Sequence, residues 1–373
     1  MYKSELPTPA VLVDLDVLAA NIRKYQEQCD RHGKQLWPMV KTHKSTVIAK
    51  KQLEAGAAGF LCGTLDECEG LCRAGIRNIM YAYPVAGRAN IERVLELAQR
   101  CNFMIRIDSI DGARMMNWAA REAGLQINYT IIIDSGLHRF GIAPEQAGVF
   151  VRALQDLSHL VFKGISTHPG HVYGASGPGD VPAYVEDERA AVAKALVSLR
   201  EAGYVPEIVS SGATPTFPGS LTDPHINILH PGNYVFHDYI QVSLGAARLT
   251  DCALSVLTTV ISHPAPGRYL CDAGAKCLGL DRGAHGNASI PGYGYVIDHP
   301  ELAVVSLSEE VGRLQAEGST DIKIGDKLEI IPNHACSAAN LTSYLFGCRG
   351  DRVEQVIPVD MRGNGTLTGV GLF

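Results

Sequence analysis

The sequence predicts an α/β protein, a (β/α)₈ TIM-type barrel followed by a C-terminal antiparallel β domain. Between residues 11 and 242, eight short apolar runs alternate with longer amphipathic stretches of helical period. After residue 243 the helical stretches give way to short strands separated by Gly, Pro, Asp and His turns. We therefore expect a barrel domain over residues 11–242 and a β domain formed by residues 1–10 together with 243–373.

The apolar runs of the first domain are nearly continuous, as expected for parallel strands that are buried on both faces. The predicted strands are Trp37–Lys41, Gly59–Gly63, Ile79–Tyr83, Phe103–Asp108, Tyr129–Asp134, Val161–Thr167, Glu207–Ser211 and Asn227–His230. The predicted helices are Leu18–His32, Thr46–Glu54, Leu65–Arg73, Ala89–Gln99, Asp111–Glu122, Pro144–Asp156 and Val181–Glu201.

The second domain is predicted to hold short strands without long helices between them. These strands are Leu254–Ser262, Tyr269–Asp272, Tyr293–Ile297, Ala303–Leu307, Lys327–Ile331, Tyr344–Phe346 and Arg352–Pro358. We expect the N-terminal segment Tyr2–Pro9 to pair with this domain before the chain enters the barrel.

The composition is that of an ordinary globular protein and excludes several classes of function. Hydrophobic residues make up 46%, charged residues 19%, and the formal net charge is −6. No Lys/Arg run indicates a nucleic-acid groove or a membrane surface, and no apolar stretch approaches the ~20 residues of a membrane helix. Because Met1–Thr8 lacks the pattern of a signal peptide, we expect a cytoplasmic protein. The ten cysteines show no disulfide framework, and we expect most to be reduced and buried.

The chemistry of a barrel lies at the carboxyl ends of its strands. Lys41 ends the first predicted strand, where burial favours the neutral amine that forms an imine with an aldehyde. The loops after strands 7 and 8, Ser211–Thr216 and Gly232–Tyr234, are rich in small and hydroxyl residues and suit a phosphate group. The alternatives are a surface lysine and two ordinary tight turns.

A second pattern, His334-x-Cys336, lies in the predicted β domain. Imidazole and thiolate two residues apart can converge on one ion, and this pair suits zinc. Without further context, a buried histidine beside a buried cysteine explains the pattern equally well.

Together these segments resemble the fold-type III, alanine-racemase-like pyridoxal-phosphate enzymes, in the branch of the D-serine dehydratases and D-threonine aldolases. The matching stretches are Thr8-Pro9-Ala10, Asp14-Leu15-Asp16 with Asn21, Lys41-Thr42-His43-Lys44, Gly136 to Gly141, Ser211 to Thr216, Gly232-Asn233-Tyr234, Asp272-Ala273-Gly274 and Pro332 to Cys336. They span residues 8–336, which makes the set far more specific than any one member.

The resemblance implies a role for each candidate residue. Lys41 would bind pyridoxal 5'-phosphate covalently, Arg139 would face the pyridine nitrogen, and Tyr173 would lie beside the cofactor. The residues around the phosphate would be Ser211, Gly212, Thr214, Gly232, Asn233 and Tyr234. His334 and Cys336 would hold a divalent metal, zinc in preference to manganese, cobalt or magnesium. His43 is a candidate proton carrier or a structural histidine, and a homodimer is implied.

The function implied is a lyase acting on a small 3-hydroxy-D-amino acid. In a dehydratase, Lys41 removes the α-proton and the metal assists departure of the β-hydroxyl, giving a 2-oxo acid and ammonia. In an aldolase, the Cα–Cβ bond breaks instead, giving glycine and an aldehyde. The Cys form of the motif resembles the dehydratases. Two departures from the relatives, Trp37-Pro38-Met39 in place of Arg-Pro-His and Val311 after Glu309-Glu310, leave the individual substrate open.

Three other functions fit part of the pattern. A racemase of this fold uses a tyrosine from the β domain of the partner subunit as its second acid or base, and His334 and Cys336 argue against it. A non-catalytic pyridoxal-phosphate carrier resembles the barrel alone, so the second domain argues against that function. A metal-dependent barrel hydrolase needs several ligands at strand ends, and His168 and His171 are the candidates here.

Overall fold

The computed structural model describes residues 1–363; residues 364–373 of the predicted second domain lie outside the described part. The first sheet is parallel, in the order β2-β9-β8-β7-β6-β5-β4-β3. Its strands are β2 (Gln35–Leu36), β3 (Phe60–Cys62), β4 (Asn78–Tyr81), β5 (Asn102–Ile107), β6 (Ile127–Ile132), β7 (Leu160–Ser166), β8 (Ile208–Ser211) and β9 (Ile228–Leu229). A bridge between Met39 and Leu61, next to the hydrogen bond from the Leu61 N–H to the Pro38 carbonyl (2.9 Å), joins the two ends of the sheet. The sheet therefore closes into the predicted barrel.

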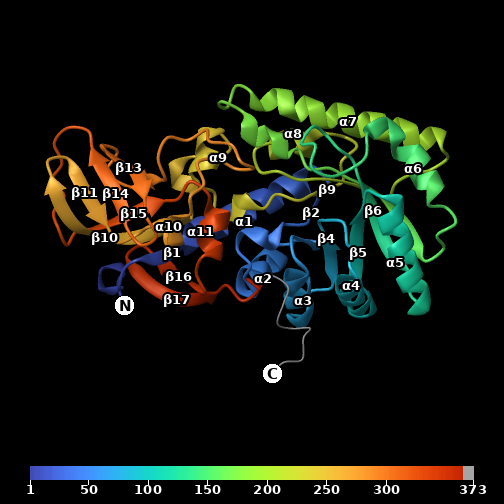
Figure 1. Ribbon diagram of the computed structural model, residues 1–373, viewed down its shortest axis with the longest axis horizontal. Helices are drawn as coiled ribbons and strands as arrows, with labels where there is room; N and C mark the ends of the chain where they lie inside the picture. The colour runs from blue at the N-terminus through green and yellow to red at the C-terminus, as the bar shows by residue number, and fades with distance from the viewer. Residues whose placement is uncertain (364–373) are drawn as a thin grey trace.

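Helices follow the strands and cover the outside of the barrel (Figure 1). They are α1 (Leu15–Arg31), α2 (Thr46–Glu54), α3 (Leu65–Arg73), α4 (Arg88–Arg100), α5 (Ile110–Glu122), α6 (Ala147–Ala153), α7 (Val181–Glu201) and α8 (Phe217–Thr222). Helix α9 (Tyr239–Ser243) lies beside the second domain instead, where the Tyr239 and Ile240 N–H groups donate to the Pro332 and Asn333 carbonyls. Side-chain N-caps define where α1 and α3 begin. The Asp14 carboxylate accepts hydrogen bonds from the N–H groups of Asp16 and Val17, and the Thr64 hydroxyl accepts one from the Glu67 N–H. Helices α2, α3 and α7 begin and end where the sequence predicts.

The first barrel strand is shorter than predicted. We expected Trp37–Lys41 to be extended, but β2 ends at Leu36 and residues Val40–Thr42 form a turn of 3₁₀ helix, η2. Pro38 has no N–H group to donate to a neighbouring strand, which ends regular pairing there. Lys41 therefore lies in a turn at the barrel mouth rather than at the end of a strand.

The second sheet has nine strands in the order β11-β14-β13-β12-β15-β10-β1-β16-β17. They are β1 (Ala10–Asp14), β10 (Leu254–Ala265), β11 (Arg268–Cys271), β12 (Tyr295–Val296), β13 (Leu302–Leu307), β14 (Gly312–Ala316), β15 (Lys327–Ile331), β16 (Tyr344–Arg349) and β17 (Arg352–Pro358). Strand β14 was missed although it alternates buried and exposed residues, and two short helices, α10 (Ala275–Leu278) and α11 (Ala335–Asn340), interrupt the strands.

Strand β1 belongs to this second sheet. It pairs antiparallel with β10 and parallel with β16, and Tyr2 forms a bridge with Arg352. Residues from both ends of the chain therefore build one sheet, as expected for Tyr2–Pro9. The sheet also takes in residues 11–14, which we had assigned to the barrel, because Val11 and Val13 are buried against it.

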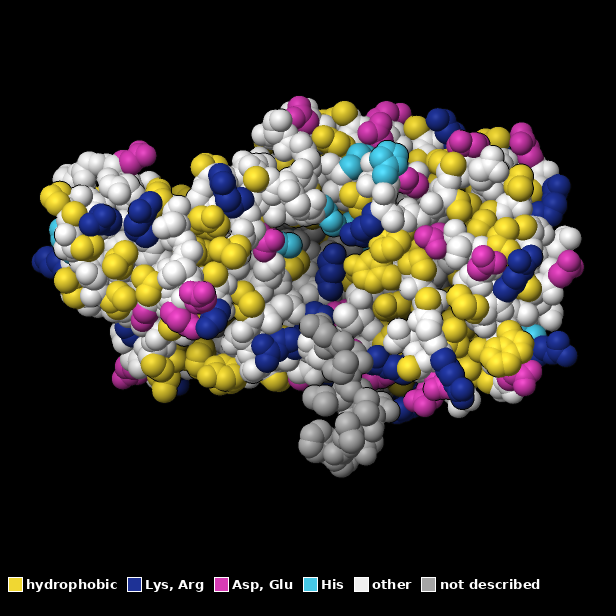
Figure 2. Space-filling model, viewed as in Figure 1, with side chains coloured by type: hydrophobic (Ala, Val, Ile, Leu, Met, Phe, Trp, Pro, Cys, Tyr) yellow, Lys and Arg dark blue, Asp and Glu magenta, His cyan; other side chains and the backbone are white. Residues whose placement is uncertain are grey.

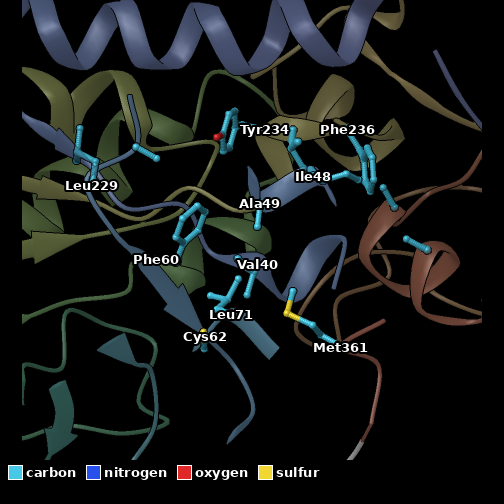
Figure 3. Close-up of a cluster of buried hydrophobic side chains, with 14 of the residues drawn as sticks. Val40, Ile48, Ala49, Phe60, Cys62, Leu71, Leu229, Tyr234, Phe236 and Met361 are labelled. Atoms are coloured by element: carbon cyan, nitrogen blue, oxygen red, sulfur yellow. The ribbon is translucent and has the colours of Figure 1, made fainter. Parts of the chain in front are cut away.

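The chain returns to the barrel after β17, where Met361 is buried among barrel residues such as Val40, Phe60 and Leu71 (Figure 3). Gly70 in α3 makes room for it, since a Cβ atom at Gly70 would lie 2.5 Å from the Met361 Cγ atom. The packing of Met361 in the barrel core thus holds the segment after the second sheet against the barrel. In the part of the chain that the structure describes, no helix has the length and apolarity to span a membrane.

Met361→Ala should therefore destabilise the protein by about 2–4 kcal/mol, because it leaves a cavity in the barrel core. Urea unfolding measures the effect. Val356→Ala, on the exposed face of β17, is the matched control and should change stability by less than about 1 kcal/mol. Equal effects of the two substitutions would contradict the packing role of Met361.

Candidate active site

A cavity opens where the mouth of the barrel meets the second sheet. Figure 2 shows a hollow at the centre of this face with basic and histidine side chains at its edge. The barrel contributes residues that follow its strands, including Lys41, Arg139 and Tyr173. The other side contributes Ala284, His285, His334 and Cys336. The cavity thus brings together sequence segments nearly 300 residues apart.

Lys41 reaches this cavity from the η2 turn. The turn is held from the opposite side, because the Asn340 side-chain amide of α11 donates a hydrogen bond to the Lys41 carbonyl over 3.1 Å. Gly63 faces the lysine: a Cβ atom there would lie 3.3 Å from the Lys41 Cβ atom, so glycine keeps the passage of the side chain open. Among the described residues, no carboxylate lies within ion-pair distance of the Lys41 amine.

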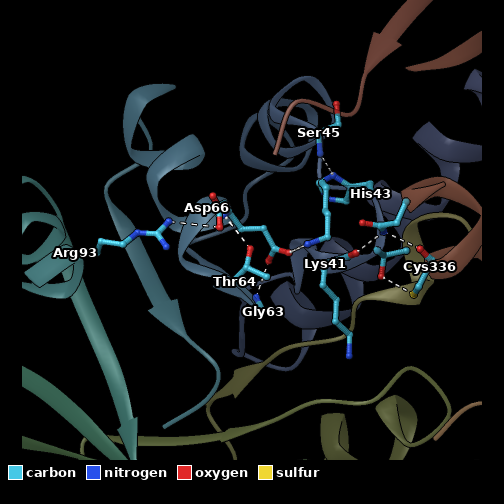
Figure 4. Close-up of polar contacts among 12 residues, drawn as sticks. Lys41, His43, Ser45, Gly63, Thr64, Asp66, Arg93 and Cys336 are labelled. Carbon is cyan, nitrogen blue, oxygen red and sulfur yellow. Dashed lines mark hydrogen bonds and ion pairs between the residues drawn. The ribbon is translucent and has the colours of Figure 1, made fainter. Parts of the chain in front are cut away.

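The neighbouring lysine, Lys44, is by contrast neutralised. Its amine lies 2.5 Å from Oε1 of Glu67, whose side chain is completely buried. The other oxygen of Glu67 accepts the Gly63 N–H over 2.6 Å. Figure 4 shows this network, with the Lys41 side chain extending away from it. Of the two lysines in the motif, Lys41 alone is available to a ligand.

The predicted phosphate loops lie at the cavity, with Gly212, Thr214, Gly232 and Asn233 lining it. Gly212 is required by close packing, since a Cβ atom there would lie 2.5 Å from the carbonyl oxygen of His230. The Thr214 hydroxyl accepts the Tyr234 N–H over 3.2 Å, which leaves its own O–H free to donate. Exposed backbone and a free hydroxyl at two adjacent loops suit a phosphate group.

Ser211 and Tyr234 were predicted beside the phosphate, but neither lines the cavity. The Ser211 hydroxyl points to the outer helix α7 and donates to Glu188 over 2.6 Å. The Tyr234 hydroxyl accepts from the Gln52 amide over 2.8 Å, and its ring packs 4.5 Å from that of Tyr25. Ser211 is the last residue of β8, where alternate side chains face opposite sides of the sheet. Tyr234 lies in a turn of 3₁₀ helix after β9, Asn233–Val235, and its ring is buried in the core.

His43 lies outside the cavity lining. It is completely buried, and its Nδ1 atom accepts the Ser45 N–H over 3.0 Å. Burial lowers its pKa to about 4, so it is neutral at physiological pH. Of the two roles that the sequence left open, a structural histidine fits this environment better than a proton carrier.

Arg139 and Tyr173 line the cavity as predicted. The Arg139 guanidinium lies over the rings of Phe140 (5.1 Å) and Tyr83 (5.7 Å) at the exposed rim. The Tyr173 hydroxyl lies 3.3 Å from the Gln241 amide, which donates to it. Burial raises the pKa of Tyr173, so the hydroxyl stays protonated and acts as a hydrogen-bonding group.

His334 and Cys336 lie together at the start of α11. Burial alone favours the neutral forms, but the neighbouring Cys336 and Asp281 raise the pKa of His334 overall. In the same way, His334 and Lys41 outweigh burial and lower the pKa of Cys336. The thiol is thus prepared to become a thiolate, the form that binds metal. Within residues 1–363, no group of three or more histidine, cysteine, aspartate or glutamate side chains is arranged to hold a metal ion.

Among the cavity residues that were not predicted as parts of this site are one arginine and three histidines, Arg106, His168, His230 and His285. Arg106 could have been identified from the sequence as a candidate site residue, because a charged residue inside the apolar run Phe103–Asp108 is unusual for a buried strand. His168 and His230 stand at strand ends, where polar residues are the ones to examine. Nothing in the turn that holds His285 indicates that it reaches the barrel.

Comparison with known proteins gives the family. Residues 13–239 match the family model of the alanine racemase N-terminal domain, and residues 253–348 match that of a putative serine dehydratase domain. The chain belongs to the alanine-racemase-like, fold-type III family of pyridoxal-phosphate enzymes. Within it, this protein is a lyase.

Individual relatives agree with this assignment. D-threo-3-hydroxyaspartate dehydratase of Delftia sp. (strain HT23) is 34% identical, over 89% of this chain and 91% of the relative. A solved variant of D-threo-3-hydroxyaspartate dehydratase, described as the metal-free form, has a TM-score of 0.88 at 32% identity, covering 96% of this chain and 98% of that one. D-threonine aldolase from Filomicrobium marinum has a TM-score of 0.89 at 28% identity, covering 96% and 97%.

Gly212→Ala should weaken pyridoxal-phosphate binding about tenfold or more, because its Cβ atom must displace the backbone of the adjacent phosphate loop. Titration of the apoprotein with the cofactor measures this. Gly177→Ala is the control, since nothing lies within 4 Å of its added Cβ atom. Unchanged binding by Gly212→Ala would argue against the phosphate cradle.

The buried histidines make stability depend on pH. A histidine with pKa about 4 in the folded state and about 6.5 in the unfolded state binds more protons when unfolded, so stability is lost as pH falls through this window. Between pH 7 and pH 5, His43 should account for about 2 kcal/mol of the loss. His43→Gln should lose correspondingly less stability over this range in urea unfolding. An unchanged pH dependence would show that His43 is not buried in its neutral form.

Proposed function

We propose that this protein is a pyridoxal-phosphate- and divalent-metal-dependent lyase that removes the β-hydroxyl of a 3-hydroxy-D-amino acid. The products are a 2-oxo acid and ammonia, as for a D-serine dehydratase. The observation that carries the proposal is the meeting of two kinds of group in one cavity: an unpaired lysine beside a phosphate cradle, and an imidazole–thiolate pair.

Lys41 has the position of the residue that binds the cofactor aldehyde. Its amine, free of carboxylates, is also the group placed to take the proton from the substrate Cα atom. When bound, pyridoxal phosphate withdraws electrons from Cα and a divalent metal polarises the β-hydroxyl. Gly212, Thr214 and Gly232 would hold the phosphate, and Tyr173 and Arg139 would bound the ring.

His334 and Cys336 would hold the metal. The lowered pKa of Cys336 supports this role, because the thiolate is the ligand form and a soft ligand favours zinc over manganese, cobalt or magnesium. A metal held by these two residues would have further coordination positions for substrate and water. The metal-free form in which a similar dehydratase was solved supports metal use in this site.

The second candidate is cleavage of the Cα–Cβ bond, as in a D-threonine aldolase. The match to the aldolase from Filomicrobium marinum over 96% of this chain favours it. Both reactions use the same lysine and the same metal pair, and they differ in which bond at Cβ breaks. The imidazole–thiolate pair at the cavity argues against a racemase.

We further propose a homodimer in which the cavity rim is covered by a second copy. The support is the apolar rim formed by Tyr83 and Phe140, the latter 39% exposed, next to the cavity. Light scattering at defined concentrations measures the mass directly, and a monomer at micromolar concentration would contradict this proposal.

A product assay tests the reaction. Incubation with D-serine, D-threonine and 3-hydroxy-D-aspartate should give ammonia and a 2-oxo acid. Glycine with an aldehyde would instead establish the aldolase, and racemised substrate would overturn both. Lys41→Ala should lower the rate at least about 1,000-fold and abolish the visible absorption band of the bound cofactor.

The metal role has a separate test. Cys336→Ala should lower the zinc content of the purified protein and lower the rate to that of the chelator-treated wild type. Cys277→Ala, a cysteine outside the cavity, is the matched control and should keep both. Full activity in chelator, or zinc retained by the Cys336 variant, would remove the metal from the mechanism.

A further inference from the structure

Asp238 is a completely buried carboxylate that has no role in the proposed function. It follows the phosphate loop Gly232–Tyr234 and is the N-cap of helix α9, where its Oδ1 atom accepts the Gln241 N–H over 3.0 Å. Its Oδ2 atom accepts two more hydrogen bonds, from the Asn233 side-chain amide over 2.5 Å and from the Ala335 N–H over 2.8 Å. Because a buried charge is costly unless it is hydrogen-bonded, the carboxylate and its three N–H partners hold one another in place.

One partner of Asp238 belongs to the segment that carries the candidate metal ligands. Ala335 stands between His334 and Cys336, so the hydrogen bond to its N–H fixes the backbone from which both side chains project. Whether two side chains can converge on one ion depends on such outer contacts. Asp238 lies outside the cavity lining, so it acts on the pair through the backbone rather than as a ligand.

A second route from the carboxylate to the metal pair runs through Asn233. The nitrogen of the Asn233 side-chain amide contacts both the Asp238 carboxylate and, over 3.7 Å, the Cys336 sulfur. Asp238 accepts from this amide and thereby determines which way it is turned, which keeps an N–H group directed at the sulfur. A hydrogen bond from that group favours the thiolate, the form of cysteine that binds a metal. Since Asn233 lines the cavity within the phosphate loop, the contact links the cofactor side of the site to the metal pair.

The third partner leads to the cofactor side alone. Gln241, whose N–H is bound by Asp238, donates from its side-chain amide to the Tyr173 hydroxyl over 3.3 Å. An N-cap of a five-residue helix such as α9 needs only one of the two carboxylate oxygens. The other oxygen binds Asn233 and Ala335, which come from the two halves of the site. Asp238 therefore does more than begin a helix, since it joins the phosphate loop to the metal pair.

We propose that Asp238 is a positioning residue that sets the metal affinity of His334 and Cys336 and makes this affinity respond to the bound cofactor. The inference rests on the metal and the cofactor of the proposed function but not on which substrate bond is broken. Outer contacts that orient metal ligands commonly change metal affinity by about 10- to 100-fold. A cofactor that orders the phosphate loop also orders Asn233 and Asp238, so less remains to be ordered when the metal binds.

The test is the zinc dissociation constant, measured by calorimetry in the apoprotein and in the cofactor-loaded protein freed of unbound cofactor. The wild type should bind zinc at least about 5-fold more tightly with the cofactor in place. Asp238→Asn keeps the size of the side chain but replaces one accepting oxygen with a donor. It should weaken zinc binding by the apoprotein about 10- to 100-fold and lose the response to the cofactor. Cys336→Ala measures the zinc that binds elsewhere on the chain.

Asp223→Asn is the matched control. Asp223 is also buried, at 3% exposure, and its carboxylate accepts the His225 N–H over 2.8 Å, but it lies outside the cavity lining. This variant should bind zinc as the wild type does, with and without the cofactor. If Asp238 had a merely structural role, Asp238→Asn would lower the unfolding temperature and leave the ratio of the two zinc constants unchanged.

Several results would overturn the proposal. One is an Asp238→Asn variant that binds zinc as tightly as Asp223→Asn, and another is an unchanged response to the cofactor in Asp238→Asn. Zinc binding by the wild type that is indifferent to the cofactor would also contradict it. If Asp238→Asn is insoluble, Asn233→Ala, which leaves the carboxylate its two backbone partners, should weaken zinc binding several-fold and lose the response. No change in that variant contradicts the proposal.

Failure of the proposed function gives different results. If the wild type binds zinc no more tightly than Cys336→Ala, the metal pair itself is refuted and this inference falls with it. If the wild type binds zinc through Cys336 and Asp238→Asn does not differ from it, this inference alone fails. A protein that cleaves the Cα–Cβ bond in the product assay, yet shows the Asp238-dependent zinc affinity, leaves this inference standing.

Discussion

The active site depends on one buried carboxylate. Glu67 binds the amine of Lys44 with one oxygen and the Gly63 N–H with the other, at 2.5 and 2.6 Å. A buried carboxylate requires such partners, so its position fixes the turn between the first two barrel strands. The same pairing gives the two lysines of one short motif different roles. Lys44 is held in an ion pair, while the amine of Lys41 has no such partner among the described residues and is available at the mouth of the barrel.

Segments of the second sheet hold the same turn from the other side. Asn340 bonds to the Lys41 carbonyl, the Thr42 hydroxyl lies 3.2 Å from the Cys336 sulfur, and the Met361 N–H donates to the Lys44 carbonyl over 2.9 Å. Lys41 and Cys336 are therefore positioned by one continuous set of contacts. Small shifts of α11 would move both groups together, which keeps their relative geometry constant.

The sequence predicted the fold well because buried parallel strands and amphipathic helices have opposite, recognisable patterns. It failed where a proline ended β2 and where the short strand β14 lay among turns. For the site, the expectation that functional residues follow the carboxyl ends of barrel strands correctly placed Lys41, Gly212 and Asn233 at one cavity. It could not tell which way Ser211 turns, because a small polar residue fits either face of a strand end.

The composition of the second sheet has a consequence for how the protein is made. Strand β1 lies between β10 and β16, so residues 10–14 pair with residues 254–257 and 346–348. On the ribosome, the barrel can assemble from strands that follow one another closely, while β1 waits for neighbours translated more than 200 residues later. His334, Cys336 and Asn340, whose side chain binds the Lys41 carbonyl, all lie in segments that are translated late. A nascent chain can therefore carry the barrel before the segments that complete the cavity have been translated.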